Sequence, residues 1–142
     1  GELLSIQACL TTIKIIERDN VINKLERLGK SLKNQLNMIL KNENLYEEVC
    51  LEGNDWWPRF NIKETELNKD IFNSLLRQEF LSNGLFLGAS LNLCQSHLAH
   101  NIQSQTLKKF KTAINTFKHI KGSKNPEKYL KGKKVESVFK VR

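Results

Sequence analysis

The segment "CQSHLAH" spaces a thiol and two imidazoles three residues apart, as Cys94, His97 and His100. Such side chains bind zinc, but a structural site needs four ligands, and no second cluster of cysteine, histidine or carboxylate residues in the sequence completes the set. A thiol beside an imidazole can also act as nucleophile and base, yet nothing in the sequence orients the base or supplies oxyanion donors. We therefore favour a third interpretation, in which this segment packs at an interface and its imidazoles hydrogen-bond to backbone groups.

A second candidate, Arg59, lies among aromatic residues in the strand-like segment "WWPRFNI". Its guanidinium can bind a carboxylate through two parallel hydrogen bonds. It can equally stack on an indole or pair with a glutamate at an interface, and the sequence favours these two roles. The tryptophan pair is interpreted as a packing anchor or a contact to another domain. The sequence has no glycine-rich phosphate loop and no pair of carboxylates at a convincing catalytic spacing.

Four helices are expected to position these groups, because apolar residues recur at helical steps over 3–16, 21–40, 68–82 and 102–119. The first is apolar on most sides, so we expect it to be buried on more than one side. Gly29 interrupts the second helix at a cost of about 1 kcal/mol relative to alanine. Close packing against a neighbouring segment would explain that glycine.

Short apolar runs predict strands at 46–51, 56–62 and 85–88, and 91–94 is a weaker strand candidate. Gly53, Asn54 and Asp55 form a turn signal between the first two strands. A few strands with helices segregated to one face make a two-layer α/β fold, which is the fold class that the sequence predicts.

The composition fits one globular domain of 142 residues, and no apolar run reaches the roughly 20 residues of a membrane helix. The sequence shows no secretory signal. Its odd number of cysteines, Cys9, Cys50 and Cys94, argues against a disulfide framework and favours buried free thiols in a reducing cytoplasm. The chain also starts without a methionine or a helix-capping residue, which predicts that it is part of a longer protein.

The net charge of +8 suggests nucleic-acid binding, but most of that charge lies in the basic C-terminal tail, 121–142. The tail has eight basic and two acidic residues, a net of +6, whereas 1–120 has fifteen basic and thirteen acidic residues, a net of +2. The aromatic residues do not alternate with basic ones, as a base-stacking surface would require. A nucleic-acid binder acting through the tail therefore remains an alternative hypothesis, as does a free-standing α/β binding module.

The whole chain resembles the C-terminal small domain of class III, fold-type I pyridoxal-phosphate aminotransferases. Within that class it resembles the glutamate-1-semialdehyde aminomutase-like branch most. The stretch "GELLSIQACLTTIKIIERDNVINKLERLGKSLKNQL" is similar to the helix pair that follows the family's "TFGGE" segment. "FLSNGLFLGASLNLCQSHLAHNIQSQTLKKFKTAINTF" resembles the family's "RG(I/V)" strand, "S-x-A-H" turn and following helix, and "LKGKKVESVFKVR" resembles the tails of polysaccharide-linked relatives. The matching positions of the second stretch are Gly84, Ser96, Ala99 and His100, with Leu98 at the variable place.

This resemblance implies that 1–120 is a small domain whose first helix leads to a large cofactor-binding domain outside this sequence, in an enzyme expected to be a homodimer. The family's chemistry is amino-group transfer through a Schiff base between lysine and pyridoxal 5'-phosphate, on an amino acid or another small amino or keto compound. The lysine, the aspartate at the pyridine nitrogen and a phosphate-binding threonine would all precede Gly1. This chain alone is therefore expected to be inactive, with no catalytic residue of its own and no metal.

The resemblance also places the small domain beside the substrate cleft, where it helps the site to close. Arg59 is then a candidate for a cation facing a substrate carboxylate, although this branch is thought to take its main carboxylate arginine from elsewhere. His97 and His100 are candidates for residues near the cleft, and we favour a role for them in shaping the turn at the domain interface. The sequence does not separate an aminomutase from an intermolecular aminotransferase.

Overall fold

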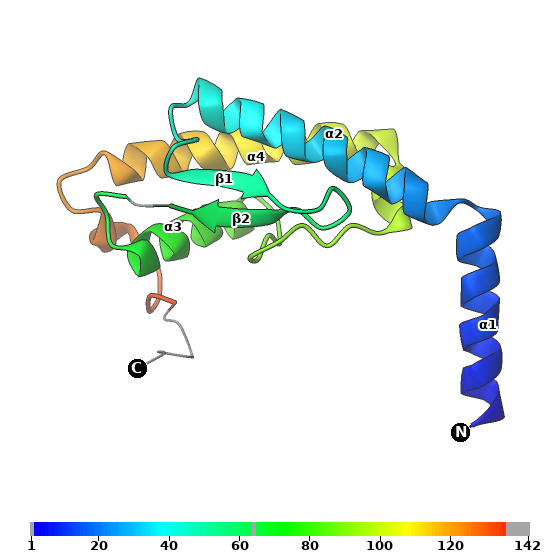
Figure 1. The fold of residues 1–142 in the computed structure, drawn as a ribbon. Helices are drawn as coiled ribbons and strands as arrows, with labels where there is room; N and C mark the ends of the chain where they lie inside the picture. Colours follow the sequence, from blue (N-terminus) through cyan, green and yellow to red (C-terminus); the bar gives the residue numbers. More distant parts are fainter. Residues whose placement is uncertain (1, 64, 136–142) are drawn as a thin grey trace.

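The computed structural model describes residues 2–63 and 65–135, with the backbone alone for His100 (Figure 1). This part of the chain is mixed α/β, with four α-helices and one antiparallel pair of strands. Its elements in chain order are α1 (Leu3–Arg18), α2 (Val21–Asn42), β1 (Val49–Glu52), β2 (Arg59–Ile62), α3 (Lys69–Ser82), the 3-10 helix η1 (Gln95–Leu98), α4 (His100–Lys121) and the 3-10 helix η2 (Pro126–Tyr129). The four helices confirm the helical periodicity of the sequence to within a few residues.

The β1–β2 hairpin confirms the first two predicted strands, although both are shorter than expected. The prediction of a third strand at 85–88 is wrong. A tight turn, in which the Leu87 N–H donates to the Leu85 carbonyl at 3.0 Å, interrupts that apolar run. The chain then meets β2 only at a single bridge between Arg59 and Ser90, and 91–94 forms no strand.

Both edges of the hairpin are closed by other parts of the chain, so neither presents a free ladder of backbone groups. At the β1 edge, the Asn37 side chain of α2 donates to the Leu51 carbonyl and accepts from the Leu51 N–H, both at 2.8 Å. At the β2 edge, the Phe60 N–H donates to the Ala89 carbonyl at 2.9 Å. A side chain therefore takes the place of a third strand on one side, and a loop does so on the other.

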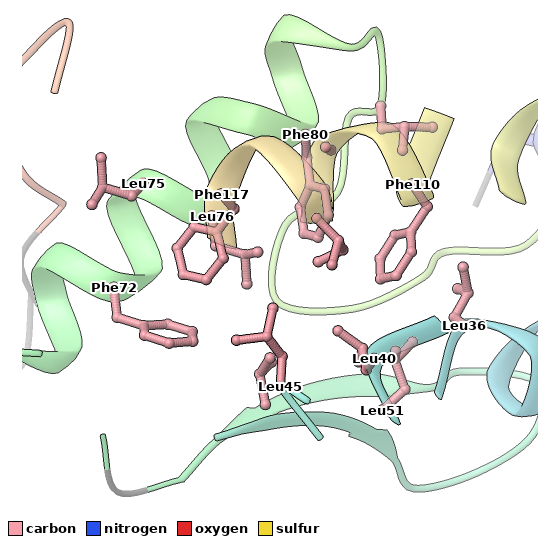
Figure 2. Close-up of a cluster of buried hydrophobic side chains, with 14 of the residues drawn as sticks. Leu36, Leu40, Leu45, Leu51, Phe72, Leu75, Leu76, Phe80, Phe110 and Phe117 are labelled. Carbon is pink, nitrogen blue, oxygen red and sulfur yellow. The ribbon is translucent and has the colours of Figure 1, made fainter. Parts of the chain in front are cut away.

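The hydrophobic core lies between the hairpin and helices α2, α3 and α4 (Figures 1 and 2). Phe72 and Phe80 of α3 meet Phe117 and Phe110 of α4, and the Phe72 and Phe117 rings pack edge-on at 4.8 Å between centroids. All four rings are at most 1% exposed. Burying one such side chain stabilises the folded state by about 1.5–3 kcal/mol, so the aromatic contacts between α3 and α4, the aromatic seam, anchor the fold.

Helix α1 forms as predicted but projects away from this core (Figure 1). None of its side chains is buried, so the covering surface that the sequence predicts for this helix is not supplied by the described residues. The chain enters α2 through Asn20, whose positive φ of 51° redirects the backbone. The apolar residues of α1 therefore lie outside the core that 21–130 build.

The first part of the basic tail packs along α3. The Gln78 side chain donates to the Tyr129 carbonyl at 3.0 Å and accepts from the Lys131 N–H at 2.8 Å. The Val135 N–H donates to Ser74 Oγ at 2.8 Å, which continues this contact by one more turn of α3.

Over the described residues, no helix has the length and apolarity needed to cross a membrane.

Candidate functional site

Arg59 begins β2 and is exposed, on the strand face opposite the core. It lies between Glu52, its partner on β1, and Ser90, its partner in the isolated bridge. Its guanidinium carbon lies 6.0 Å from the centroid of the Trp57 ring, at the outer limit of a cation–π contact. No salt bridge joins Arg59 to any residue in the described part of the chain. The guanidinium therefore rests near an indole with its hydrogen-bond donors open to solvent or ligand.

The Trp57 ring is held by a hydrogen bond that two acceptors share. Its indole N–H donates to Ser90 Oγ at 2.9 Å and to Asn92 Oδ1 at 2.7 Å. The Ser90 hydroxyl in turn donates to Asn92 Oδ1 at 3.3 Å. An indole has only one N–H, so these acceptors fix how the ring is turned. The segment that follows α3 thus orients Trp57 and also pairs with the backbone of Arg59.

The loop that carries Trp57 is attached to α2 by a partly buried lysine. Lys33 Nζ donates to the Gly53 carbonyl at 2.9 Å and pairs with the Asp55 carboxylate at 2.5 Å. The Trp57 N–H closes a turn on the Asn54 carbonyl at 3.0 Å. These contacts hold the loop against α2, and they leave the two tryptophans exposed at the surface. Trp56 and Trp57 stack with centroids 6.2 Å apart.

A hollow of about 530 Å³ lies next to this cluster. Its walls are the segment that follows α3, one leucine of α2, His97, and the first turns of α4. The polar side chains that face it come mainly from Ser90, Asn92, Gln103 and Thr106. No lysine, arginine, aspartate or glutamate is among its described lining residues. Its size suits a small molecule, and its lining suits an uncharged part of one.

His97 lines the hollow, and its ring is engaged by the backbone as the sequence analysis favoured. Its Nδ1 accepts from the Cys94 N–H at 2.9 Å and lies 3.3 Å from Cys94 Sγ. A neutral ring that accepts at Nδ1 carries its proton on Nε2. His100 begins α4, and its side chain lies outside the described residues. The described residues contain no cluster of three or more metal-ligating side chains.

Pyridoxal phosphate needs a lysine amine, donors for its phosphate and an acid for its pyridine nitrogen. The hollow offers none of these charged groups among its described residues, so its residues do not fit the cofactor by themselves. We assign no step of pyridoxal chemistry to this chain. What the arrangement can do is bind an anion at Arg59 and accommodate an uncharged group beside it.

The structure places two of the three predicted site residues, Arg59 and His97, in different relations to the hollow, and the His100 side chain lies outside the described residues. His97 lines it, whereas Arg59 meets it only through its bridge partner Ser90. The sequence analysis missed Ser90 and Asn92, because a short polar stretch after a glycine reads as an ordinary turn. Only their pairing with Trp57, more than 30 residues away in the chain, gives them a role.

No protein-family model, no curated protein and no solved structure matches this chain.

Proposed function

We propose that this chain is the C-terminal small domain of a class III pyridoxal-phosphate enzyme, an aminotransferase or aminomutase similar to glutamate-1-semialdehyde aminomutase. The order and spacing of the resembling segments, which extend over nearly the whole chain, support this proposal. The mixed α/β architecture is compatible with the two-layer small domain of such enzymes. The reaction would be amino-group transfer on a small amino or keto compound.

The observation that carries the proposal is the uncovered apolar surface of α1. Leu3 is 82% exposed and Leu4 is 75% exposed. The other large apolar side chains exposed on this helix are Ile6, Leu10, Ile13 and Ile15. Burying apolar surface stabilises a protein by about 25 cal/mol per Å², and a contiguous exposed patch marks an interaction surface. In the proposed enzyme, the large domain or the second subunit of a homodimer covers α1.

The proposed division of labour follows from the family resemblance. The large domain supplies the cofactor lysine, the acid at the pyridine nitrogen and the phosphate site. The small domain contributes a rigid wall beside the substrate, built on the aromatic seam between α3 and α4. Its exposed hairpin face, with Arg59 and Trp57, is the surface that faces the substrate cleft in this proposal. Closure of a cleft by a small domain excludes water from the reacting groups.

The test is to purify the product of the whole reading frame that encodes this chain. We expect its visible spectrum to show the lysine Schiff base of pyridoxal phosphate. Borohydride reduction followed by peptide mapping should place the modified lysine outside residues 1–142. A product without bound cofactor, or with the modified lysine inside this chain, would overturn the proposal.

A variant pair tests the role of α1 in the same product. Ile13→Glu places a charge on the apolar surface, and Lys14→Glu reverses the charge at the adjacent exposed position. We expect Ile13→Glu to weaken cofactor retention and subunit association in the whole-gene product, while Lys14→Glu leaves both unchanged. In the 142-residue chain, neither variant should change the urea midpoint, because α1 buries no side chain there. Equal cofactor retention and equal subunit association in the two variants would contradict the proposal that another part of the protein covers α1.

A further inference from the structure

We propose that the surface between α3 and the basic tail is a docking site for a short acidic peptide segment of another protein. The site, the α3–tail groove, has a volume of about 420 Å³ and lies between α3, the loop at 86–88 and the tail at 130–135. Its occupant carries carboxylates beside bulky apolar side chains. This docking site is independent of the proposed cofactor chemistry, because none of its lining residues is assigned a role in that chemistry.

The fold leaves large apolar side chains of the groove exposed. Phe86 is 92% exposed, the highest value among the large apolar side chains that the structure describes, and Leu81 is 55% exposed. Val135 is exposed on the tail side of the groove. The half-buried Leu87 and Leu130 continue this apolar surface toward the core. An exposed apolar patch of this kind marks an interaction surface.

The groove exists because the tail is held beside α3. Two α3 side chains, Ser74 and Gln78, bond to backbone groups of the tail (Figure 1). The part of α3 that lines the groove, 74–82, is about 12 Å long at a rise of about 1.5 Å per residue. An extended peptide covers that distance in about four residues. The groove therefore fits a short linear segment that inserts one or two apolar side chains.

The charged side chains at the groove are cations. Arg77 and Lys133 line it, and Lys131 Nζ lies 3.5 Å from Ser82 Oγ, which is another lining group. None of these three cations forms a salt bridge within the described residues. No aspartate or glutamate is among the described lining residues. Complementary charge favours an acidic partner and like charge rejects a basic one, so the groove selects a negatively charged segment.

The shape of the site favours a peptide over an anionic membrane surface, which would offer the same charge. Elements that bind a membrane surface present their apolar side chains together on one face, ready for insertion. In the α3–tail groove, Leu81 comes from α3 and Val135 from the tail, so the apolar side chains line different walls of a concavity. A concave apolar site receives side chains of a partner, as grooves that bind peptides do.

The experiment titrates the isotope-labelled 142-residue chain with the capped octapeptide Asp-Glu-Phe-Asp-Glu-Leu-Asp-Glu. The readout is the NMR shift of the backbone amides of Gly88 and Gly132, which line two walls of the groove. We expect both signals to move and saturate with this peptide. They should move little with the neutral peptide Asn-Gln-Phe-Asn-Gln-Leu-Asn-Gln, and little with an acidic peptide that has serine in place of Phe and Leu. Salt should weaken the binding without abolishing it, because screening leaves the apolar contact in place.

Variants of exposed residues test the apolar and the charged parts separately. Phe86→Ser and Leu81→Ser should each weaken binding about tenfold, the loss expected when a large apolar side chain no longer becomes buried. Ile22→Ser is their control, because Ile22 is exposed on α2 outside the groove. Lys133→Glu should weaken binding several-fold, whereas Lys124→Glu makes the same change of net charge outside the groove and should have little effect. Phe86→Ser should keep the wild-type urea midpoint, since this side chain is exposed in the folded state.

Three results would overturn the inference: equal binding of the acidic and neutral peptides, unchanged binding in Phe86→Ser, or equal effects of Lys133→Glu and Lys124→Glu. Sedimentation of the chain with vesicles of phosphatidylcholine and phosphatidylglycerol, without peptide binding, would assign the surface to a membrane and overturn the peptide. The titration is then repeated with the whole-gene product. Loss of binding there would show that another part of the same protein covers the groove, which would also overturn the inference. The peptide titration of the chain contains no cofactor, so its failure does not bear on the Schiff-base test.

Discussion

The backbone carbonyl of Asp55 occupies the space where a Cβ on Gly29 would stand. An ideal Cβ there would lie 2.7 Å from the Asp55 carbonyl carbon and 2.9 Å from Leu93 Cδ1. Helix α2 therefore passes in direct contact with the loop that carries the two tryptophans. The glycine, which weakens the helix locally, is what permits this approach, and Lys33 one turn later fastens the same loop.

Gly29→Ala is expected to destabilise the chain by about 1–3 kcal/mol, as overpacking does. The gain in helix propensity, about 1 kcal/mol, only partly offsets an overlap with backbone atoms that cannot rotate away. Urea unfolding measures the change. Gly132→Ala is the matched control, because a Cβ at Gly132 meets nothing within 4 Å. A Gly29→Ala variant as stable as this control would show that the loop does not rest on α2.

Asn37→Leu is expected to destabilise the fold by about 2 kcal/mol, because it leaves the buried Leu51 N–H and carbonyl unpaired. Amide hydrogen exchange at Leu51 should accelerate as well, since its N–H loses its acceptor. Asn34→Leu makes the same change at an exposed position of α2 and should alter neither quantity. Unchanged exchange at Leu51 would contradict the closing of the strand edge by Asn37.

Cys50 should be far less reactive toward thiol reagents than Cys9 and Cys94. It is 4% exposed, and burial raises the pKa of its thiol above the ordinary value of 9.0. The other two cysteines are exposed, so the sequence-based prediction of buried thiols is wrong for both. We expect two thiols to be alkylated in the native chain at neutral pH and the third only after unfolding. Peptide mapping of the alkylated sites makes the assignment, and prompt labelling of Cys50 would contradict its burial.

The raised pKa of Cys50 also sets a direction for stability against pH. The folded state favours the neutral thiol, so this contribution is complete below pH 9.0 and is lost as the pH rises through the raised value. The stability difference between the wild type and Cys50→Ala should therefore shrink at alkaline pH. A difference that grows over that range would reverse the sign and refute the argument.

Gln78→Ala should release the segment around Tyr129 and Lys131 from α3. The amide of Gln78 supplies one donor and one acceptor to this segment, and alanine supplies neither. Trypsin should then cleave after Lys131 several-fold faster than in the wild type. Gln35→Ala is the control, because Gln35 bonds only within its own helix, at Ser31. Equal cleavage rates in the two variants would show that the contact does not restrain the segment.

The sequence by itself determined the four helices and the hairpin, because periodic burial and turn residues are local properties that a few neighbouring positions encode. It also identified Gly29, Arg59 and His97 as unusual positions. It failed at 85–88, where an apolar run reads as a strand although a tight turn prevents pairing.

Only the tertiary structure decided what those positions contact. Trp57 meets Ser90 and Asn92 across more than 30 residues of chain, and Asn37 meets Leu51 across 14. Apolar character predicted a covering surface for α1, and in the described structure its side chains are uncovered. Side-chain hydrogen bonds between distant segments depend on how helices and strands pack, and the pattern of any one segment does not contain that information.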